Sequence, residues 1–200
     1  MRKPDSYRAL VAAAALTAPA VAIAHTGLGD THGVLHGFMH PIGGLDHVLA
    51  MVAVGVIAAQ IGGRALWAVP ASFVVAMAIA GAYGMAGLAL PDPAIGIALS
   101  VVVLGAVVAL RVRLPIAIVA AMVAAFAIFH GYSHALEMDA ARSGVAFGFG
   151  FVLATALLHL SGIALGQALT RLDRGGLVAR IGGAAVAVAG AAMFTSSLVA

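Results

Sequence analysis

The chain has 200 residues, of which 64% are hydrophobic and only 8% are charged, and it contains no cysteine. Soluble domains carry about 25% charged residues, so this composition excludes a soluble globular protein. The lack of cysteine excludes disulfides and thiolate metal sites. A formal net charge of +3 without a basic patch gives no support for nucleic-acid binding. Continuous Ala-, Leu- and Val-rich runs predict an all-α, polytopic membrane helical bundle rather than a β-barrel, whose strands alternate in polarity.

The first 24 residues have the pattern of a cleavable signal peptide. Three basic residues before position 9 precede an apolar stretch, and Ala22-Ile23-Ala24 fits a small-x-small cleavage site. Cleavage after Ala24 would leave His25 as the mature N-terminus, outside the cytoplasm. The alternative is an uncleaved first helix.

Six apolar spans follow within a single membrane domain over residues 25–200. Their predicted ranges are 41–61, 65–89, 94–110, 114–134, 144–169 and 178–198. With the mature N-terminus outside, six arginines fall in the inner loops and only Arg142 falls in an outer segment. Positive charge is enriched in cytoplasmic loops, so this bias supports the same orientation. We expect a multi-pass protein of the bacterial inner membrane with both mature termini in the periplasm.

Ionisable side chains concentrate around the start of the first span. They are His32, His36, His40, Asp46 and His47. The first three, spaced by four residues, would form one stripe along a helix. Pro41, however, disfavours helical geometry at the preceding residue and removes a hydrogen bond. We therefore expect a bend near His40 and Pro41, with Asp46 and His47 one to two turns inside the membrane helix.

Two further polar groups lie in later spans. His130, His134 and Glu137 are spaced i, i+4, i+7 and so share a helix face at the outer end of the fourth span. The predicted topology places them at the same membrane surface as the first cluster. Thr155 and His159 are four residues apart near the middle of the fifth span.

This residue set points to a divalent metal cation. Imidazole and carboxylate are ligands of Ni²⁺, Co²⁺ and Zn²⁺, and composition alone does not choose among these ions. Ionisable groups inside a membrane tend to mark ion paths. The candidate metal-handling residues are His36, His40, Asp46, His47, His130, His134, Glu137 and His159. Candidates for capture at the outer surface are His25 and His32. The structural alternatives are a packing role for His159, a hydrogen-bonded pair for Asp46 and His47, and a helix-cap role for the second cluster.

Enzymatic alternatives remain open at this point. An intramembrane serine hydrolase would need Ser133 to face a histidine, but adjacent helix residues do not face each other, and no nucleophile motif appears. A zinc hydrolase would need three ligands and an open water position. A haem protein would need axial histidines on facing helices, which nothing specific supports. Met51 is a candidate weak ligand, although a packed core position is the simpler interpretation. Glycine pairs at 144 and 148 and at 162 and 166 predict close helix packing.

Three stretches resemble one known family. HPIGGLDHVLAMVAVG, residues 40–55, closely resembles the HP-x-x-G-x-DH-x-x-AM-x-x-VG signature of the HupE/UreJ family. FHGYSHALEM is similar to its second motif, FHG-x-AHG-x-E, with Ser133 and Ala135 where Ala and Gly are usual. GFGFVLATALLHLSG resembles the fifth-span pattern that ends at His159. The family is described as nickel or cobalt permeases found beside hydrogenase and urease systems.

The resemblance implies a permease and not an enzyme. It assigns metal passage to His36, His40, Asp46, His47, His130 and Glu137. Ni²⁺ or Co²⁺ would be the transported substrate, with no permanently bound cofactor. The expected partners are the metal ion, the lipid bilayer and, functionally, nickel enzymes such as hydrogenase or urease, while homo-oligomerisation is left open. The chain has no Walker A motif, so we expect passive or gradient-driven transport. The alternatives are an intramembrane metal-dependent hydrolase and a metal-binding accessory protein for hydrogenase or urease maturation.

Overall fold

The computed structural model describes residues 33–90, 92–112, 114–137, 144–172 and 176–199. Within these ranges the regular structure is entirely α-helical. The helices are α2 (Val34–Gly43), α3 (Leu45–Ile61), α4 (Ala65–Met85), α5 (Pro93–Leu110), α6 (Ile116–Glu137), α7 (Gly144–Leu172) and α8 (Leu177–Ser197). The predicted signal peptide, His25 and His32 lie outside the described residues.

The helices have the lengths and composition that a bilayer requires. Five of them, α4 to α8, are long and apolar enough to cross a membrane, and α2 with α3 passes the same test as one bent span. The protein is therefore a multi-pass α-helical membrane protein, and the predicted fold class is confirmed. The helix ends differ from the predicted spans by a few residues, because α4 ends at Met85 and α6 continues to Glu137.

Local sequence signals account for several helix ends. Asp92 caps α5, because its Oδ1 accepts a hydrogen bond from the backbone N–H of Ala94 at 2.9 Å, and Pro93 occupies the first helical position. At the end of α3, Gly62 takes a positive φ of 76°, and its N–H donates to the carbonyl of Ala58. Asp92 thus marks where α5 begins, and Gly62 marks where α3 ends.

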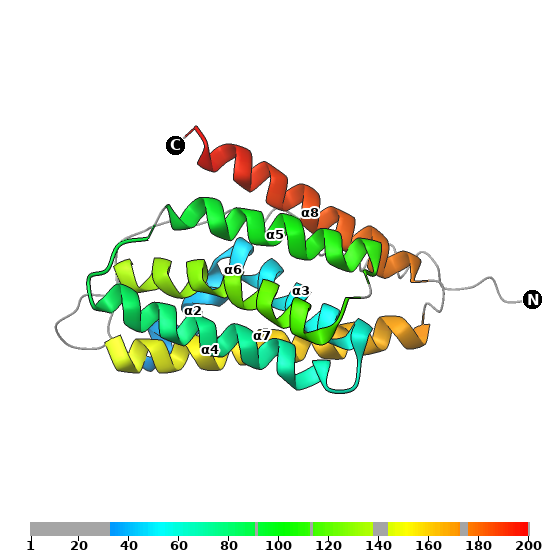
Figure 1. The fold of residues 1–200 in the computed structure, drawn as a ribbon, viewed down its shortest axis with the longest axis horizontal. Coiled ribbons are helices and arrows are strands. Elements are labelled where there is room, and N and C mark those ends of the chain that lie inside the picture. Colours follow the sequence, from blue (N-terminus) through cyan, green and yellow to red (C-terminus); the bar gives the residue numbers. More distant parts are fainter. Residues whose placement is uncertain (1–32, 91, 113, 138–143, 173–175, 200) are drawn as a thin grey trace, which may run out of the picture.

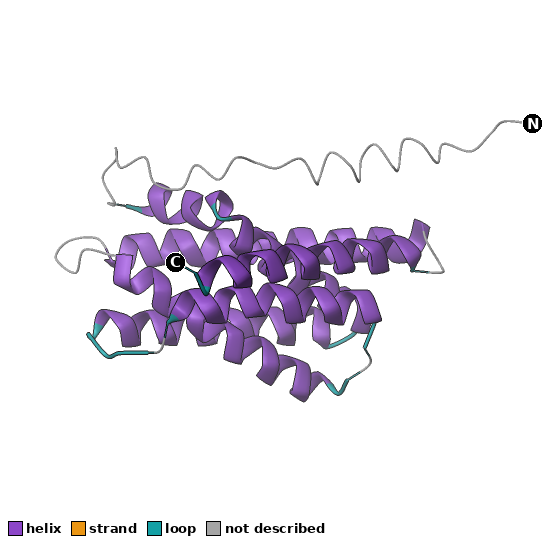
Figure 2. Cartoon of the chain, turned by 90° about the horizontal axis from the view of Figure 1, so that it is seen from above, coloured by secondary structure: helices purple, strands orange, loops and turns teal. Residues whose placement is uncertain are grey.

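The helices pair side by side around α3 (Figure 1). The most extensive contacts join α4 to α6, α5 to α8 and α3 to α7, while α2 lies against α7. The central helix, α3, contacts every other helix that the structure describes. In contrast, α8 packs mainly on α5 at the edge of the bundle, where most of its surface is exposed (Figure 1). Figure 2 shows the bundle turned by 90°, with helices as the regular structure of the described residues.

Glycines allow the central pair of helices to approach closely. A Cβ added to Gly55 would overlap the carbonyl oxygen of His159, and one added to Gly162 would overlap that of Val52. Gly166 meets Ala59 in the same seam, so the predicted packing surface at residues 162 and 166 is confirmed. The prediction for Gly148 is wrong, because a Cβ there meets nothing within 4 Å.

The bend in the first span lies at Gly44 and not at His40 and Pro41. Helix α2 continues through Pro41 to Gly43, and α3 starts at Leu45 at an angle of 85°. A Cβ on Gly44 would lie 2.8 Å from Oδ1 of Asp46 and 2.9 Å from Nδ1 of His47, so a larger residue at the break would displace the Asp46–His47 pair. Asp46 and His47 consequently lie in the first turn of α3, and not one to two turns inside a longer helix.

Other side chains occupy the positions that their chemistry favours. Met51 is fully buried in the apolar core, as the packing interpretation predicts. Trp67, near the start of α4, is exposed on the surface of the bundle. The amide of Gln60 donates to the carbonyl of Val108 at 3.2 Å and so ties the end of α3 to the end of α5.

Candidate functional site

The first turn of α3 holds a carboxylate–imidazole pair. Oδ1 of Asp46 lies 2.6 Å from Nδ1 of His47 and also accepts from the His47 backbone N–H at 2.8 Å. The positive end of the helix dipole favours a carboxylate at this position. A carboxylate that accepts from one ring nitrogen keeps the proton there, so Nδ1 of His47 carries the hydrogen and Nε2 presents its lone pair.

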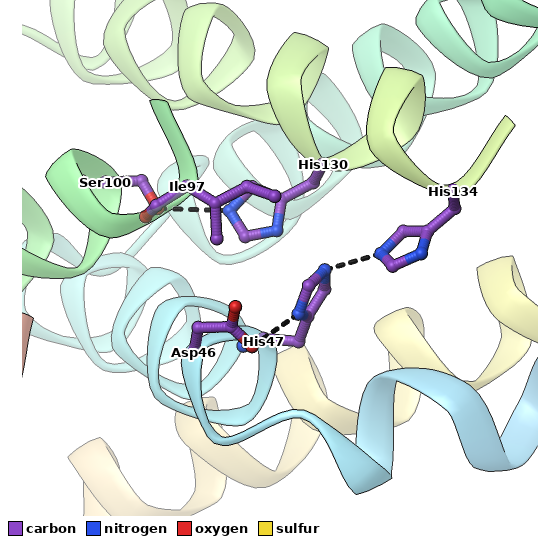
Figure 3. A network of polar contacts seen from close by, with 6 residues as sticks. All are labelled: Asp46, His47, Ile97, Ser100, His130 and His134. Carbon is purple, nitrogen blue, oxygen red and sulfur yellow. Dashed lines mark hydrogen bonds and ion pairs between the residues drawn. The ribbon is translucent and has the colours of Figure 1, made fainter. Parts of the chain in front are cut away.

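Two histidines of α6 face this pair. His130 and His134 are four residues apart and lie on one face of the helix, as predicted, and both are buried. Nε2 of His134 lies 2.5 Å from Nε2 of His47 (Figure 3). The ring of His130 is 4.8 Å from that of His47, measured between centroids. The two predicted polar clusters, 83 or more residues apart in sequence, therefore meet inside the bundle.

Ser100 on α5 sets the proton position of His130. The Ser100 hydroxyl donates to the carbonyl of Ile97 at 2.6 Å, and its Oγ lies 3.0 Å from Nε2 of His130. Because the only hydroxyl proton points to Ile97, Oγ accepts a hydrogen bond from Nε2–H of His130 (Figure 3). Nδ1 of His130 then carries a lone pair, and this buried atom has no hydrogen-bond partner among the described residues.

The row of rings continues outward along α2. The His40 ring lies 4.5 Å from that of His134, and the His36 ring lies 6.1 Å from that of His40, again between centroids. Both α2 histidines are half-buried. From α2 toward the interior of the bundle, the histidine row consists of His36, His40, His134, His47 and His130.

Aromatic rings of α7 form one wall of the histidine row. Phe147 lies 5.6 Å from His40, and Phe151 lies 4.4 Å from His134, measured between ring centroids. Gly37 and Gly150 bring α2 onto α7, because a Cβ on either would overlap a backbone carbonyl of the other helix. The same small-residue packing thus places the α2 histidines beside this wall.

One predicted residue, His159, lies beside the histidine row and not within it. His159 on α7 is 1% exposed, and neither of its ring nitrogens has a hydrogen-bond partner in the described part of the chain. The ring of Phe73 contacts both His130 and His159, at 5.5 and 5.1 Å between centroids. Glu137 is the last residue of α6, and its side chain lies outside what the structure describes.

Comparison with known proteins matches the sequence of this chain to one family. The family model described as HupE / UreJ protein matches residues 12–193 of the chain. The chain belongs to the HupE/UreJ family. Protein HupE of Rhizobium leguminosarum bv. viciae is 46% identical to this HupE/UreJ member over 181 residues, which cover 90% of the chain and 93% of that protein. No solved structure matches the chain.

The described residues of this HupE/UreJ member contain no group of three His, Asp or Glu side chains arranged to hold a metal as they stand. Imidazole nitrogens bind Zn²⁺ at about 2.0–2.1 Å. The facing Nε2 atoms of His47 and His134, 2.5 Å apart, would have to separate to admit an ion between them. The histidine row is therefore suited to successive sites of few protein ligands, completed by water, and not to one closed structural site.

Sequence reasoning missed Ser100 and Phe73. Ser100 is the only polar side chain of α5, and a lone hydroxyl in an apolar span is a signal that could have found it. Phe73 is one apolar residue among many on α4, and nothing in the sequence distinguishes it. Its role follows only from the contacts between α4, α6 and α7.

Proposed function

We propose that this member of the HupE/UreJ family is an inner-membrane permease for a divalent transition-metal cation. Ni²⁺ is the first candidate substrate and Co²⁺ the second, as the motif resemblance implies. The observation that carries the proposal is the histidine row, which starts half-buried at His36 and reaches the fully buried His130 inside the bundle.

The chemistry of the row suits passage better than storage. Conduction requires sites that bind well enough to admit an ion and weakly enough, or in sufficient number, to release it. Imidazoles whose neighbouring ring centroids lie 4.5–6.1 Å apart offer such a series. In this proposal the α2 histidines capture the ion and replace part of its hydration shell, and Asp46 stabilises the charge at His47.

Asp46 has a further task as a positioning residue. By holding the proton on Nδ1 of His47, it keeps Nε2 directed at His134 as a ligand. Ser100 does the same for His130 from the opposite side. Both contacts fix which ring nitrogen carries the proton and how the ring is oriented, and so leave the other nitrogen available to a metal.

The membrane potential supplies a driving force for uptake. An inside-negative potential favours entry by about 2.3 kcal/mol per elementary charge per 100 mV, and a divalent ion gains about twice that. Transport in this proposal is powered by the potential or an ion gradient, without ATP.

The test is uptake of radioactive nickel by sealed proteoliposomes with an inside-negative potential. An external chelator removes surface-bound metal, and an ionophore then releases lumenal metal, so the two pools are counted separately. We expect time-dependent lumenal accumulation that exceeds protein-free vesicles and is reduced by Co²⁺. If the protein binds nickel but none reaches the lumen, the permease proposal fails, and a metal-binding accessory protein or metal-dependent hydrolase becomes the better account.

A further inference from the structure

Phe73 occupies the point where the histidine row stops. Its side chain is fully buried on α4 and is in ring contact with both His130 and His159. A second contact joins α7 to α4: the hydroxyl of Thr155 on α7 donates to the sulfur of Met77 on α4 at 3.8 Å. The Phe73 and Met77 face of α4 is thus apposed to the Thr155 and His159 face of α7.

We propose that the ring of Phe73 is a gate that separates the histidine row from an inner metal-binding station at His159. This inference rests on the proposed transport function and deepens it. His159 is suited to the station because it is a buried imidazole whose two nitrogens have no hydrogen-bond partner among the described residues. Leaving a buried polar group unpaired is costly, which points to a ligand that occupies it intermittently.

The ring blocks passage for a chemical reason. An ion handed from one imidazole to the next needs nitrogen ligands on both sides, each about 2.0–2.1 Å away for a zinc-like ion. A phenyl ring provides no lone pair and excludes the water that would complete the coordination shell. Apolar constrictions of this kind gate ion pathways by excluding water. The ring must therefore move before an ion can leave His130 for His159.

Space for that movement begins one helical turn from Phe73. An open pocket of about 240 Å³ lies between α4, α6 and α7, and Met77, Gly81, Gly131, His134 and Phe151 are among its lining residues, while Phe73 itself is not. Met77 is one helical turn from Phe73 on the same face of α4. Methionine side chains are flexible, so Met77 can shift into the pocket and vacate volume beside the Phe73 ring.

The chain offers a clean test because it has no native cysteine. We would introduce His159→Cys as the sole thiol and add silver ions to the outer face of spheroplasts. Samples are taken over time, denatured and treated with a maleimide, which labels only thiols that silver has not reached. The loss of maleimide labelling with time gives the silver reaction rate. The same measurement on His40→Cys reports access to the outer end of the row.

The gate predicts one specific change. In the His159→Cys background, Phe73→Leu should raise the silver reaction rate by about tenfold or more, because the apolar constriction is reduced. The His40→Cys rate should not change. Phe129→Leu is the matched control, since this α6 ring packs on Gly96 of α5, and it should leave both rates unchanged. If Phe73→Leu fails to fold, Phe73→Met replaces it as the variant expected to raise the silver reaction rate at His159→Cys.

The gate would be overturned if silver reacted with His159→Cys at the same rate whether or not Phe73 is replaced. The comparison uses a folded Phe73→Leu or Phe73→Met variant. The result is separable from the proposed function, because silver access does not depend on nickel uptake. Nickel uptake by the wild type with Phe73-independent silver access would retain the permease and refute the gate. Phe73-dependent access without nickel uptake would retain the gate as a barrier and refute the permease.

Discussion

Two helix pairs of this bundle are built alike and carry very different chemistry. In the α3–α7 pair, Gly55 and Gly162 allow backbone-to-backbone contact, and in the α5–α8 pair Gly105 and Gly183 do the same. The first pair contains two histidines and an aspartate within the bundle. The second contains no His, Asp or Glu in either helix, and its one charged side chain, Arg180, hydrogen-bonds the carbonyl of Ala109.

The difference shows which feature marks the site. Glycine-mediated packing in membranes brings helices together whether or not they do chemistry. Ionisable groups inside the bilayer are costly and persist where they are used. Among the described helices, those that combine close packing with His, Asp or Glu side chains are α2, α3, α6 and α7. The side of α5 that faces α6 contributes one hydroxyl, that of Ser100, while the side that faces α8 contributes apolar contacts.

The largest effect is expected at the acid that orients the row. Asp46→Asn removes the carboxylate that holds the His47 proton, and loss of such a supporting group typically costs about 10–100-fold in metal affinity or activity. Nickel uptake should fall within that range. Asp92→Asn is the matched control, because Asp92 is also an acid near a helix start but only caps α5. Equal losses in both variants would contradict a special role for the α3 acid.

A smaller effect is expected on the α5 side of the row. Ser100→Ala removes the acceptor for Nε2–H of His130, so this ring loses its fixed orientation and uptake should fall by about tenfold. Ser161→Ala is the control, since that exposed hydroxyl bonds only to the Leu158 carbonyl of its own helix. Unchanged uptake in Ser100→Ala would show that the His130 tautomer does not matter.

Acid should weaken uptake by a few-fold. A metal-binding imidazole must be neutral, so protons compete with the ion for the ring nitrogens of the row. Uptake measured at a constant membrane potential should therefore be lower at pH 6.0 than at pH 7.5. A rate that rises steadily toward pH 5 would instead indicate coupling to protons.

The smallest effect on uptake is expected in the α5–α8 pair. A Cβ at Gly105 would lie 2.5 Å from the backbone nitrogen of Ala187, so Gly105→Ala should lower the melting temperature of the purified protein. Uptake per folded molecule should be unchanged, because this seam contains no metal-binding group. Gly148→Ala, at a position with no neighbour within 4 Å, should change neither quantity. If folded Gly105→Ala showed reduced uptake, the α5–α8 pair could no longer be distinguished from the α3–α7 pair as a packing seam without a role in transport.

The sequence predicted the helices and most of the row for simple physical reasons. Long apolar runs identify membrane spans, and the i, i+4 spacing of His130 and His134 places them on one face. The Asp46–His47 pair could be predicted as a unit because its members are adjacent, although its place in the first turn of α3 could not. That place depends on the bend, and both Pro41 and Gly44 are plausible breakers until the packing around the pair is known.

Contacts between distant helices could not be predicted in the same way. The contact that links His130 to His159 is made by Phe73, an apolar residue on a helix without His, Asp or Glu. The tautomer of His130 depends on a hydroxyl from α5, and no local pattern pairs these two residues. Sequence periodicity identifies a helix face, but not which neighbouring helix that face meets.

X-ray absorption spectroscopy of nickel bound to the purified protein tests the histidine row most directly. The account predicts imidazole scattering from at least two histidines in the wild type, reduced in His47→Ala, with the spectrum of Asp92→Asn unchanged. A spectrum dominated by water or carboxylate oxygen, and identical in wild type and His47→Ala, would contradict the claim that the facing imidazoles of α3 and α6 bind the ion.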